Sequence, residues 1–292
     1  MSEWTQWPAP AKLNLFLHVR GRRADGYHDL ETVFQIVDRG DTVEVRLRSD
    51  GEIRRCRAIP GIAEDEDLSV RAARRLQAEC GATQGADLRV TKRLPAGGGL
   101  GGGSSNAATV LVALNALWAG GLGEERLAAL GLELGADVPV FVHGHSAWGG
   151  GVGERLEPVD LSPSWYLVVD PGARIPTAEV FGAPELTRDT PPSTIAAFRA
   201  GEVRNDCEPV VRSRWPVVGE ALSWLSRFGP ARMSGTGGCC FAAFATEEAA
   251  QAAYRRLPEP WSGFVARGVE RSPLHERLTR WRNRGVQSSI GA

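Results

Sequence analysis

Several features that mark other classes of protein are scarce in this chain of 292 residues. Its 34 basic residues are balanced by 35 acidic ones, so the net charge is only -1. Proteins that bind nucleic acid through a strong positive field need an excess of basic residues, and this chain lacks one. It also lacks an apolar run near the roughly 20 residues that span a bilayer, and a basic N-terminal segment followed by an apolar stretch. We therefore expect a soluble cytoplasmic protein that binds neither nucleic acid nor membranes.

Cysteine is also sparse, and its spacing is uninformative for metals. The five cysteines are Cys56, Cys80, Cys207, Cys239 and Cys240. An odd number without a C-x-x-C pair is typical of reduced thiols rather than of a disulfide framework or a zinc site. We expect buried structural thiols and no metal site built by the protein alone.

Lysine is rarer still, because Lys12 and Lys92 are the only lysines among the 34 basic residues. An ammonium group differs from a guanidinium in size, hydration and ability to share a proton. The two lysines are either leftovers of a bias toward arginine or residues that the chemistry requires. Their surroundings have to decide between these interpretations.

The periodicity of the chain predicts a mixture of strands and helices. Residues 12–19 alternate with period two, which predicts a strand with Lys12, Asn14, Phe16 and His18 on one face. Further strands are predicted over 32–37, 42–47, 88–91, 165–169, 232–234, 240–244 and 264–269, and helices over 67–80, 105–118, 124–134, 217–228, 247–257 and 273–281. Because strands and helices do not alternate regularly, an α+β fold is favoured over a doubly wound sheet.

The most informative stretch holds six glycines in seven positions, followed by two serines and a helix. Without a Cβ, glycine lets the backbone approach a ligand and turn its N–H groups inward. The helix that follows points unpaired amides and its positive dipole end at the same place. A phosphate site is therefore favoured over a flexible linker. Its residues are Pro95, Ala96, Gly97, Gly98, Gly99, Leu100, Gly101, Gly102, Gly103, Ser104 and Ser105.

Three common phosphate loops fit this stretch poorly. The spacing from Gly98 to Gly103 is that of a Walker A motif, but Ser104-Ser105 stands where a Lys-Ser/Thr pair is required. The pattern Gly97-x-Gly99-x-x-Gly102 matches the dinucleotide fingerprint, yet it lies outside an evident βαβ unit. A protein-kinase loop would need H-R-D and D-F-G downstream, and neither sequence occurs.

Three motifs in order resemble the GHMP kinases. They are Pro8-Ala9-Pro10-Ala11-Lys12-Leu13-Asn14-Leu15, the glycine loop, and Met233-Ser234-Gly235-Thr236-Gly237-Gly238-Cys239-Cys240-Phe241. The resemblance implies a two-domain α+β fold, with an ATP-binding domain over 1–150 and a C-terminal domain over 151–270. A segment at about 270–284 would pack back on the first domain, and 285–292 would be a frayed tail.

The stretches at 23–30, 134–141 and 171–177 resemble one branch of this family. That branch phosphorylates the 2-hydroxyl of a cytidine-diphosphate-linked methylerythritol, in the methylerythritol phosphate route to isoprenoids. The resemblance implies ATP as the phosphoryl donor, with Mg²⁺ held mainly by the nucleotide. The alternatives are a GHMP kinase with another small acceptor, such as mevalonate or homoserine, and a non-catalytic nucleotide-binding protein.

The same resemblance implies roles for single residues. Lys12 and Asp137 would be catalytic, although Asp137 could instead be a carboxylate that caps a helix. Lys92 could contact ATP or be a solvated cation. Acceptor-binding roles are implied for Asn14, Tyr27, His28, Thr177 and Phe181, with Tyr27 and Phe181 on the two faces of the cytosine ring and His28 at its edge.

Overall fold

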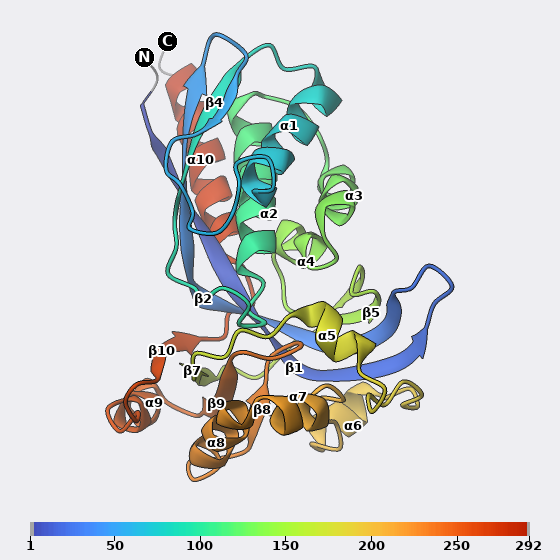
Figure 1. Cartoon of the computed structure of the whole chain (residues 1–292). Coiled ribbons are helices and arrows are strands. Elements are labelled where there is room, and N and C mark those ends of the chain that lie inside the picture. Colours follow the sequence, from blue (N-terminus) through green and yellow to red (C-terminus); the bar gives the residue numbers. More distant parts are fainter. Residues whose placement is uncertain (1–2, 291–292) are drawn as a thin grey trace.

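The computed structural model describes the backbone of residues 3–290 and the side chains of residues 3–284. Two sheets divide the chain into an upper and a lower half in Figure 1. The upper sheet has six strands, in the order β3-β4-β2-β5-β6 with β1 also paired to β2. They are β1 (Thr5–Arg22), β2 (His28–Arg48), β3 (Ile53–Arg55), β4 (Gly85–Thr91), β5 (Ala147–Gly151) and β6 (Arg155–Pro158).

β1 and β2 form one long antiparallel pair whose hairpin extends away from the upper half, to the right in Figure 1. The two short strands predicted over 32–37 and 42–47 are parts of the single strand β2. The pairing is irregular in the middle, where it steps from Pro10 opposite Gly40 to Lys12 opposite Ile36. A Cβ at Gly40 would overlap the carbonyl oxygen of Ala9. The extra residues of this step lie on β2, between Ile36 and Gly40, and face the stretch of β1 from Pro10 to Lys12.

A second register shift between Asn14 and Leu17 changes which side chains share a face. Lys12, Asn14 and Leu17 line the same cavity, whereas Phe16 is buried in a core cluster beside Leu13. Strict alternation had placed Phe16 on the face of Lys12 and Asn14, and that expectation was wrong because of the shift.

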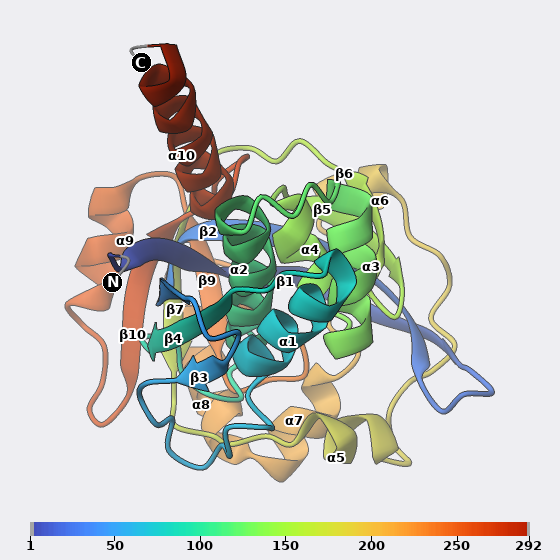
Figure 2. The same cartoon turned by 90° about the horizontal axis from the view of Figure 1, so that it is seen from above.

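Helices cover one side of the upper sheet, and Figure 2 shows them grouped there. They are α1 (Leu68–Cys80), α2 (Gly102–Leu117), α3 (Glu124–Leu134) and α4 (Val138–His143). The predicted ends of α1 are confirmed, since Asp67 accepts a hydrogen bond from the amide of Ser69 and Gly81 ends the helix in the left-handed conformation. α2 is buried along most of its length, which fixes the orientation of the loop before it.

The lower half contains a four-stranded antiparallel sheet in the order β10-β7-β9-β8. Its strands are β7 (Trp165–Asp170), β8 (Ala231–Met233), β9 (Cys240–Phe244) and β10 (Ser262–Arg267). Its helices are α5 (Thr177–Gly182), α6 (Ile195–Arg199), α7 (Glu208–Arg214), α8 (Pro216–Leu225) and α9 (Glu247–Tyr254). Each half therefore combines a sheet with helices, and neither half is built from regular βα repeats. This confirms the α+β class.

The last helix, α10 (Pro273–Ile290), returns from the lower half to the upper one (Figure 1). Leu274 is part of the upper core, the Trp281 ring lies 5.9 Å from that of Trp7, and Arg277 Nε donates to the carbonyl of Gln6 at 3.0 Å. The helix extends through most of the segment expected to fray, and residues 291 and 292 lie outside the described part.

Two smaller expectations have different outcomes. Cys207, Cys239 and Cys240 are buried free thiols as predicted, but Cys56 is exposed and Cys80 is half-buried. Burial raises the pKa of Cys207 to about 12, so this thiol stays protonated and unreactive. Among the described helices, none combines the length and the apolar character needed to cross a membrane.

Candidate active site

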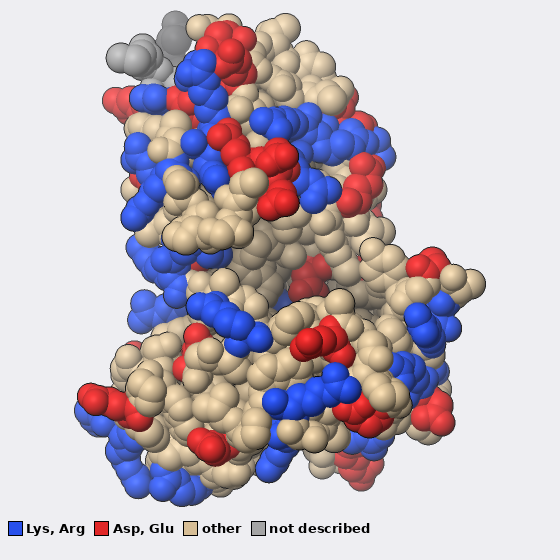
Figure 3. Space-filling view, in the orientation of Figure 1, with Lys and Arg blue, Asp and Glu red and all other residues tan. Residues whose placement is uncertain are grey.

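A cavity of about 840 Å³ lies between the two halves, where Figure 3 shows the surface hollowed. It is lined by residues of β1, β2, both glycine loops, the turn before α4, and α5. All seven residues predicted to be catalytic or acceptor-binding line it, namely Lys12, Asn14, Tyr27, His28, Asp137, Thr177 and Phe181. Gly97, Gly99 and Ser104 of the predicted phosphate loop line the same cavity.

The glycine loop adopts a backbone that side chains disfavour. Gly97, Gly99 and Gly101 have φ values of 72°, 73° and 71°, in the left-handed region that glycine occupies without strain. α2 begins at Gly102, three residues before the predicted start at Ser105. The free amides of the first helical turn therefore belong to the glycine run itself, which is where an anion would approach.

The second glycine loop holds the first one in place. Ser234 Oγ donates to the carbonyl of Gly99 at 2.8 Å, and the amide of Cys239 donates to the carbonyl of Gly98 at 3.1 Å. A Cβ on Gly99 would overlap the backbone of Ser234, and one on Gly238 would lie 2.5 Å from the carbonyl oxygen of Gly97. The two loops thus touch through their backbones, and each needs glycine for that contact.

Lys12 and Asp137 form an ion pair in the lining of the cavity. The Lys12 side chain is only 3% exposed, and Nζ lies 3.3 Å from Asp137 Oδ2. Nζ also donates to Asn14 Oδ1 at 2.5 Å and lies 5.4 Å from the centre of the Phe34 ring. The backbone amide of Lys12 donates to the carbonyl of Leu100 in the glycine loop, which ties the lysine to the phosphate site.

Asp137 stands at the N-cap position of α4, yet its side chain makes no capping hydrogen bond. The carboxylate is instead 35% exposed in the cavity and paired with Lys12. The capping alternative therefore fails on geometry. An accessible carboxylate beside a buried ammonium is an arrangement that can accept a proton from a bound hydroxyl.

Asn14 is fixed by hydrogen bonds on three sides. Its Nδ2 donates to Thr32 Oγ1 at 3.0 Å, its Oδ1 accepts from Lys12, and its backbone amide donates to Ser234 Oγ at 3.2 Å. The network joins β1, β2 and the second glycine loop. Such a network holds the Lys12 ammonium in one position before any ligand arrives.

Lys92 is more than a solvated cation, and its contact with ATP stays a prediction. Its Nζ forms an ion pair with Asp41, a carboxylate that is itself fully buried. Asp41 Oδ1 also accepts from the backbone amides of Arg93 at 2.7 Å and Leu94 at 2.9 Å. Asp41 and Lys92 thus fix the chain that enters the glycine loop.

The far end of the cavity is aromatic. The His28 and Phe181 rings stack with centroids 4.9 Å apart and an interplanar angle of 18°. Tyr27 is 62% exposed at the hairpin tip. All three rings line the cavity, and the placement of Tyr27 and Phe181 on the two faces of a cytosine ring stays a prediction. Thr177 at the start of α5 contacts Thr236 of the second glycine loop, with hydroxyls 3.0 Å apart.

The site offers oxygen groups but no cluster of strong metal ligands. No group of three or more His, Cys, Asp or Glu side chains suited to a metal exists in the described part of the chain. Ser105 Oγ is buried near the loop and has no hydrogen-bond partner, and Ser104 lines the same cavity as Asp137. These oxygens suit Mg²⁺ that arrives with phosphates, because that ion takes few protein ligands and keeps much of its shell from phosphate and water.

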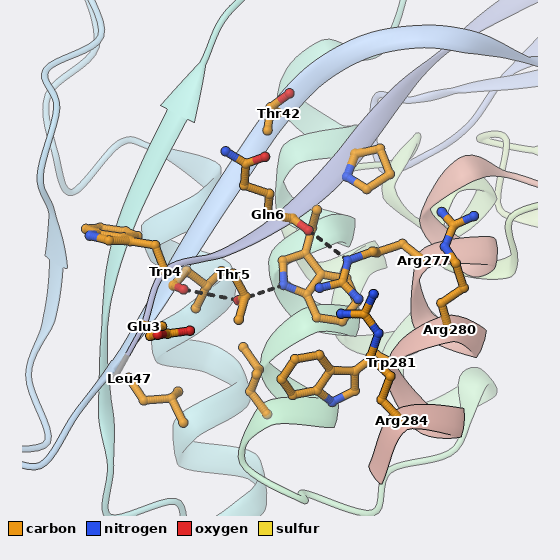
Figure 4. Close-up of a pocket in the computed structure, with 14 residues that line it drawn as sticks. Glu3, Trp4, Thr5, Gln6, Thr42, Leu47, Arg277, Arg280, Trp281 and Arg284 are labelled. Carbon is orange, nitrogen blue, oxygen red and sulfur yellow. Dashed lines mark hydrogen bonds between the residues drawn. The ribbon is translucent and has the colours of Figure 1, made fainter. Parts of the chain in front are cut away.

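A second hollow, of about 1000 Å³, lies at the other end of β1 against α10 (Figure 4). Its lining includes Trp4, Trp281, Arg277, Arg280 and Arg284. No predicted catalytic or loop residue lines it. It lies on the outer side of the upper half, so we do not assign the active site to it.

Sequence reasoning missed two residues that shape the site. Asp41 holds the entry to the glycine loop, and Arg188 contacts the ring of His28. Neither residue belongs to a motif, and each meets its partners through the fold. A lone acidic residue after a glycine carries no signal of this kind, and Arg188 is one of many arginines.

Three comparisons relate the chain to known proteins. The GHMP kinases N terminal domain matches residues 67–145, and the GHMP kinases C terminal domain matches residues 193–263. A 4-diphosphocytidyl-2-C-methyl-D-erythritol kinase of Halorhodospira halophila is 68% identical over 281 residues, which cover 95% of this chain and 98% of that protein. Its namesake in Alkalilimnicola ehrlichii is 61% identical over 289 residues, covering 99% and 98%.

A solved structure is also similar. The crystal structure of a 4-(cytidine 5'-diphospho)-2C-methyl-D-erythritol kinase matches with a TM-score of 0.80 at 34% sequence identity. The match covers 91% of this chain and 100% of that one. The likeness therefore extends over both halves of the chain.

Proposed function

The chain belongs to the GHMP kinase family, and we propose that it uses ATP to phosphorylate the 2-hydroxyl of 4-diphosphocytidyl-2-C-methyl-D-erythritol. This reaction gives the 2-phosphate and ADP, in the methylerythritol phosphate route to isoprenoid precursors. The observation that supports it best is a single cavity. It is lined by the Lys12–Asp137 pair, by residues of the glycine loop, and by the rings of Tyr27, His28 and Phe181. A phosphoryl donor, a hydroxyl and a base each find suitable groups there.

In the proposed reaction, the acceptor oxygen forms a bond to the γ-phosphorus while the bond from that phosphorus to the β–γ bridging oxygen breaks. The hydroxyl proton passes to Asp137, or Asp137 orients the hydroxyl and the proton passes to an oxygen of the transferred phosphoryl group. Lys12 stabilises the negative charge on the transferred group, because its ammonium is buried and already fixed by Asn14. Positioning and charge stabilisation supply most of the rate in phosphoryl transfer.

The loop from Pro95 to Ser105 would hold the triphosphate with backbone amides and the N-terminus of α2. Mg²⁺ bound to the phosphates would screen their charge, with Ser104 or Ser105 as the protein ligands that fit. Asn14 and Thr177 would contact the acceptor near the reacting hydroxyl. The proposal includes a cytoplasmic location, where ATP is available and free thiols stay reduced.

Tyr27, His28 and Phe181 would bind the cytosine. Phe181 stacks on His28 with one face, and a base would stack on an aromatic face that lines the cavity. His28 would then hydrogen-bond the edge of the base.

An ADP-release assay tests this proposal against its alternatives. The cytidylylated methylerythritol is compared with mevalonate, homoserine and galactose at equal concentration. We expect turnover with the first compound and background rates with the others. Turnover with only one of the others would retain the family and overturn the acceptor, whereas ATP binding without turnover of any compound would favour a non-catalytic nucleotide-binding protein.

A further inference from the structure

Arg188 lies in the segment after α5 and connects that helix to the start of β2. Its Nη2 donates to the carbonyls of Phe181 at 2.8 Å and Ala183 at 2.6 Å, and its Nη1 donates to that of Leu186 at 3.0 Å. Its Nε donates to His28 Nε2 at 3.3 Å. Arg188 thus holds both the end of the helix that carries Phe181 and the ring on which Phe181 stacks.

The contact with His28 has only one possible direction. A guanidinium has donors and no acceptor, so the imidazole nitrogen that faces Arg188 has to provide a lone pair. A neutral imidazole with a lone pair on Nε2 carries its proton on Nδ1. Among the described residues Nδ1 has no hydrogen-bond partner, and His28 lines the cavity. Its N–H therefore remains available as a donor to a ligand.

Burial and nearby positive charges, including that of Arg188, also affect the charge of the His28 ring. Burial, followed by the positive charges of Arg188 after α5 and Arg22 at the end of β1, lowers the pKa of His28. The imidazole is consequently neutral at neutral pH, and its tautomer rather than its charge determines what Nδ1 can do.

We propose that Arg188 is a positioning residue that makes the cavity selective for cytosine, by holding His28 in the tautomer with its proton on Nδ1. This inference rests on the proposed function and goes beyond it. The N3 atom of cytosine is an acceptor and matches the Nδ1–H group. The N3 atom of uracil carries a proton, so uracil would place a donor against a donor.

Nitrogen NMR of the free protein tests the tautomer without any substrate. In the wild-type protein at pH 7.5 we expect His28 Nε2 to have the chemical shift of an unprotonated imidazole nitrogen and Nδ1 that of a protonated one. In Arg188→Met the Nε2 atom is free to carry the proton, so the Nδ1 signal should move toward the unprotonated shift. A wild-type spectrum with the proton on Nε2 would overturn the proposal.

Kinetics with the cytidine substrate and its uridine analogue test the selectivity. We expect Arg188→Met to lower the ratio of the uridine KM to the cytidine KM about tenfold or more, the size of one lost or mismatched hydrogen bond. The KM for ATP should stay unchanged. Lowering the pH through the pKa of His28 should restore the ratio in the variant, because a protonated imidazole again has a proton on Nδ1.

Arg214→Met is the matched control, since Arg214 pairs with Glu185 of the same segment and does not touch His28. It should leave the KM ratio and its pH dependence unchanged. If Arg188→Met raises both KM values equally at every pH, then Arg188 only stabilises α5 and the proposal fails. If the wild-type enzyme turns over neither the cytidine nor the uridine compound, the proposed function fails, whereas the NMR result still decides the tautomer.

Discussion

The two ends of the cavity differ in how far they are organised before a ligand binds. At the phosphoryl-transfer end, Lys12 is buried and hydrogen-bonded, and the two glycine loops are joined by a backbone hydrogen bond and by the Ser234 hydroxyl. At the base end, Tyr27 is exposed and Phe181 stacks on His28 rather than facing Tyr27 across a gap. The first end is held by a polar network, whereas the second is aromatic and includes an exposed ring.

This difference has a physical reason. Transfer of a charged phosphoryl group gains most from groups that are fixed beforehand, because no reorganisation is then needed during the reaction. Base binding instead contributes to the affinity for the substrate, and an aromatic ring can stack on a base without being fixed beforehand. Changes at the first end should therefore affect kcat, and changes at the second should affect KM.

The largest expected effect is that of Asp137→Asn. The amide keeps the shape of the side chain but cannot take the hydroxyl proton, so kcat should fall about 10²- to 10⁴-fold. Binding of ATP, measured by calorimetry, should be nearly unchanged. The melting temperature should fall, because the buried Lys12 ammonium loses its ion pair with Asp137, so the comparison of kcat is made well below that temperature. A kcat within a few-fold of wild type would remove Asp137 from the proposed mechanism.

Lys12→Arg should be nearly as severe, with kcat lowered about 100-fold, although the charge is conserved. The ammonium is 3% exposed and contacts Asn14 and Asp137, so the larger guanidinium does not fit. Lys92→Arg is the matched control, since the Lys92 side chain is partly exposed and its ion pair with Asp41 can be kept by arginine. Equal losses in the two variants would contradict the distinction between the two lysines.

Gly99→Ala should destabilise the joined loops, whereas Gly97→Ala should do so much less. Both glycines have positive φ, but a Cβ on Gly99 would overlap the backbone of Ser234 and one on Gly97 would meet no atom. Strain alone costs about 1–3 kcal/mol, and overpacking adds about 1–3 kcal/mol. Urea unfolding of the free proteins measures the difference, and equal free energies of unfolding would show that the loops move apart easily.

The phosphoryl-transfer end is also the end that the sequence predicts better. The glycine runs and the residues around Lys12 are local patterns, and their resemblance to one family placed them in one cavity correctly. The contacts that complete the site join distant positions, such as Asp41 with Leu94, 53 residues apart, and Arg188 with His28, 160 residues apart. No local periodicity carries that information.

Strand length was underestimated for a related reason. Residues 28–48 contain two alternating stretches separated by polar residues and a glycine, which predicts two strands. The pairing with β1 continues past Gly40 as one irregular ladder, because partner contacts outweigh the local interruption. The register shift that removes Phe16 from the face of Lys12 and Asn14 could not be predicted for the same reason.

The smallest expected effects lie at the base end, and they test whether it is organised only by the ligand. Stacking on a base is worth about 1–3 kcal/mol per aromatic ring, so Tyr27→Ala and Phe181→Ala should each raise the KM for the cytidine substrate about 5- to 150-fold. The KM for ATP and kcat should barely change. The two variants should differ in stability, because Tyr27 is exposed and Phe181 packs on His28. We expect thermal unfolding to be lowered in Phe181→Ala and unchanged in Tyr27→Ala. If a variant raised the KM for ATP as much as the KM for the cytidine substrate, these rings would support the whole cavity. The contrast between its two ends would then be wrong.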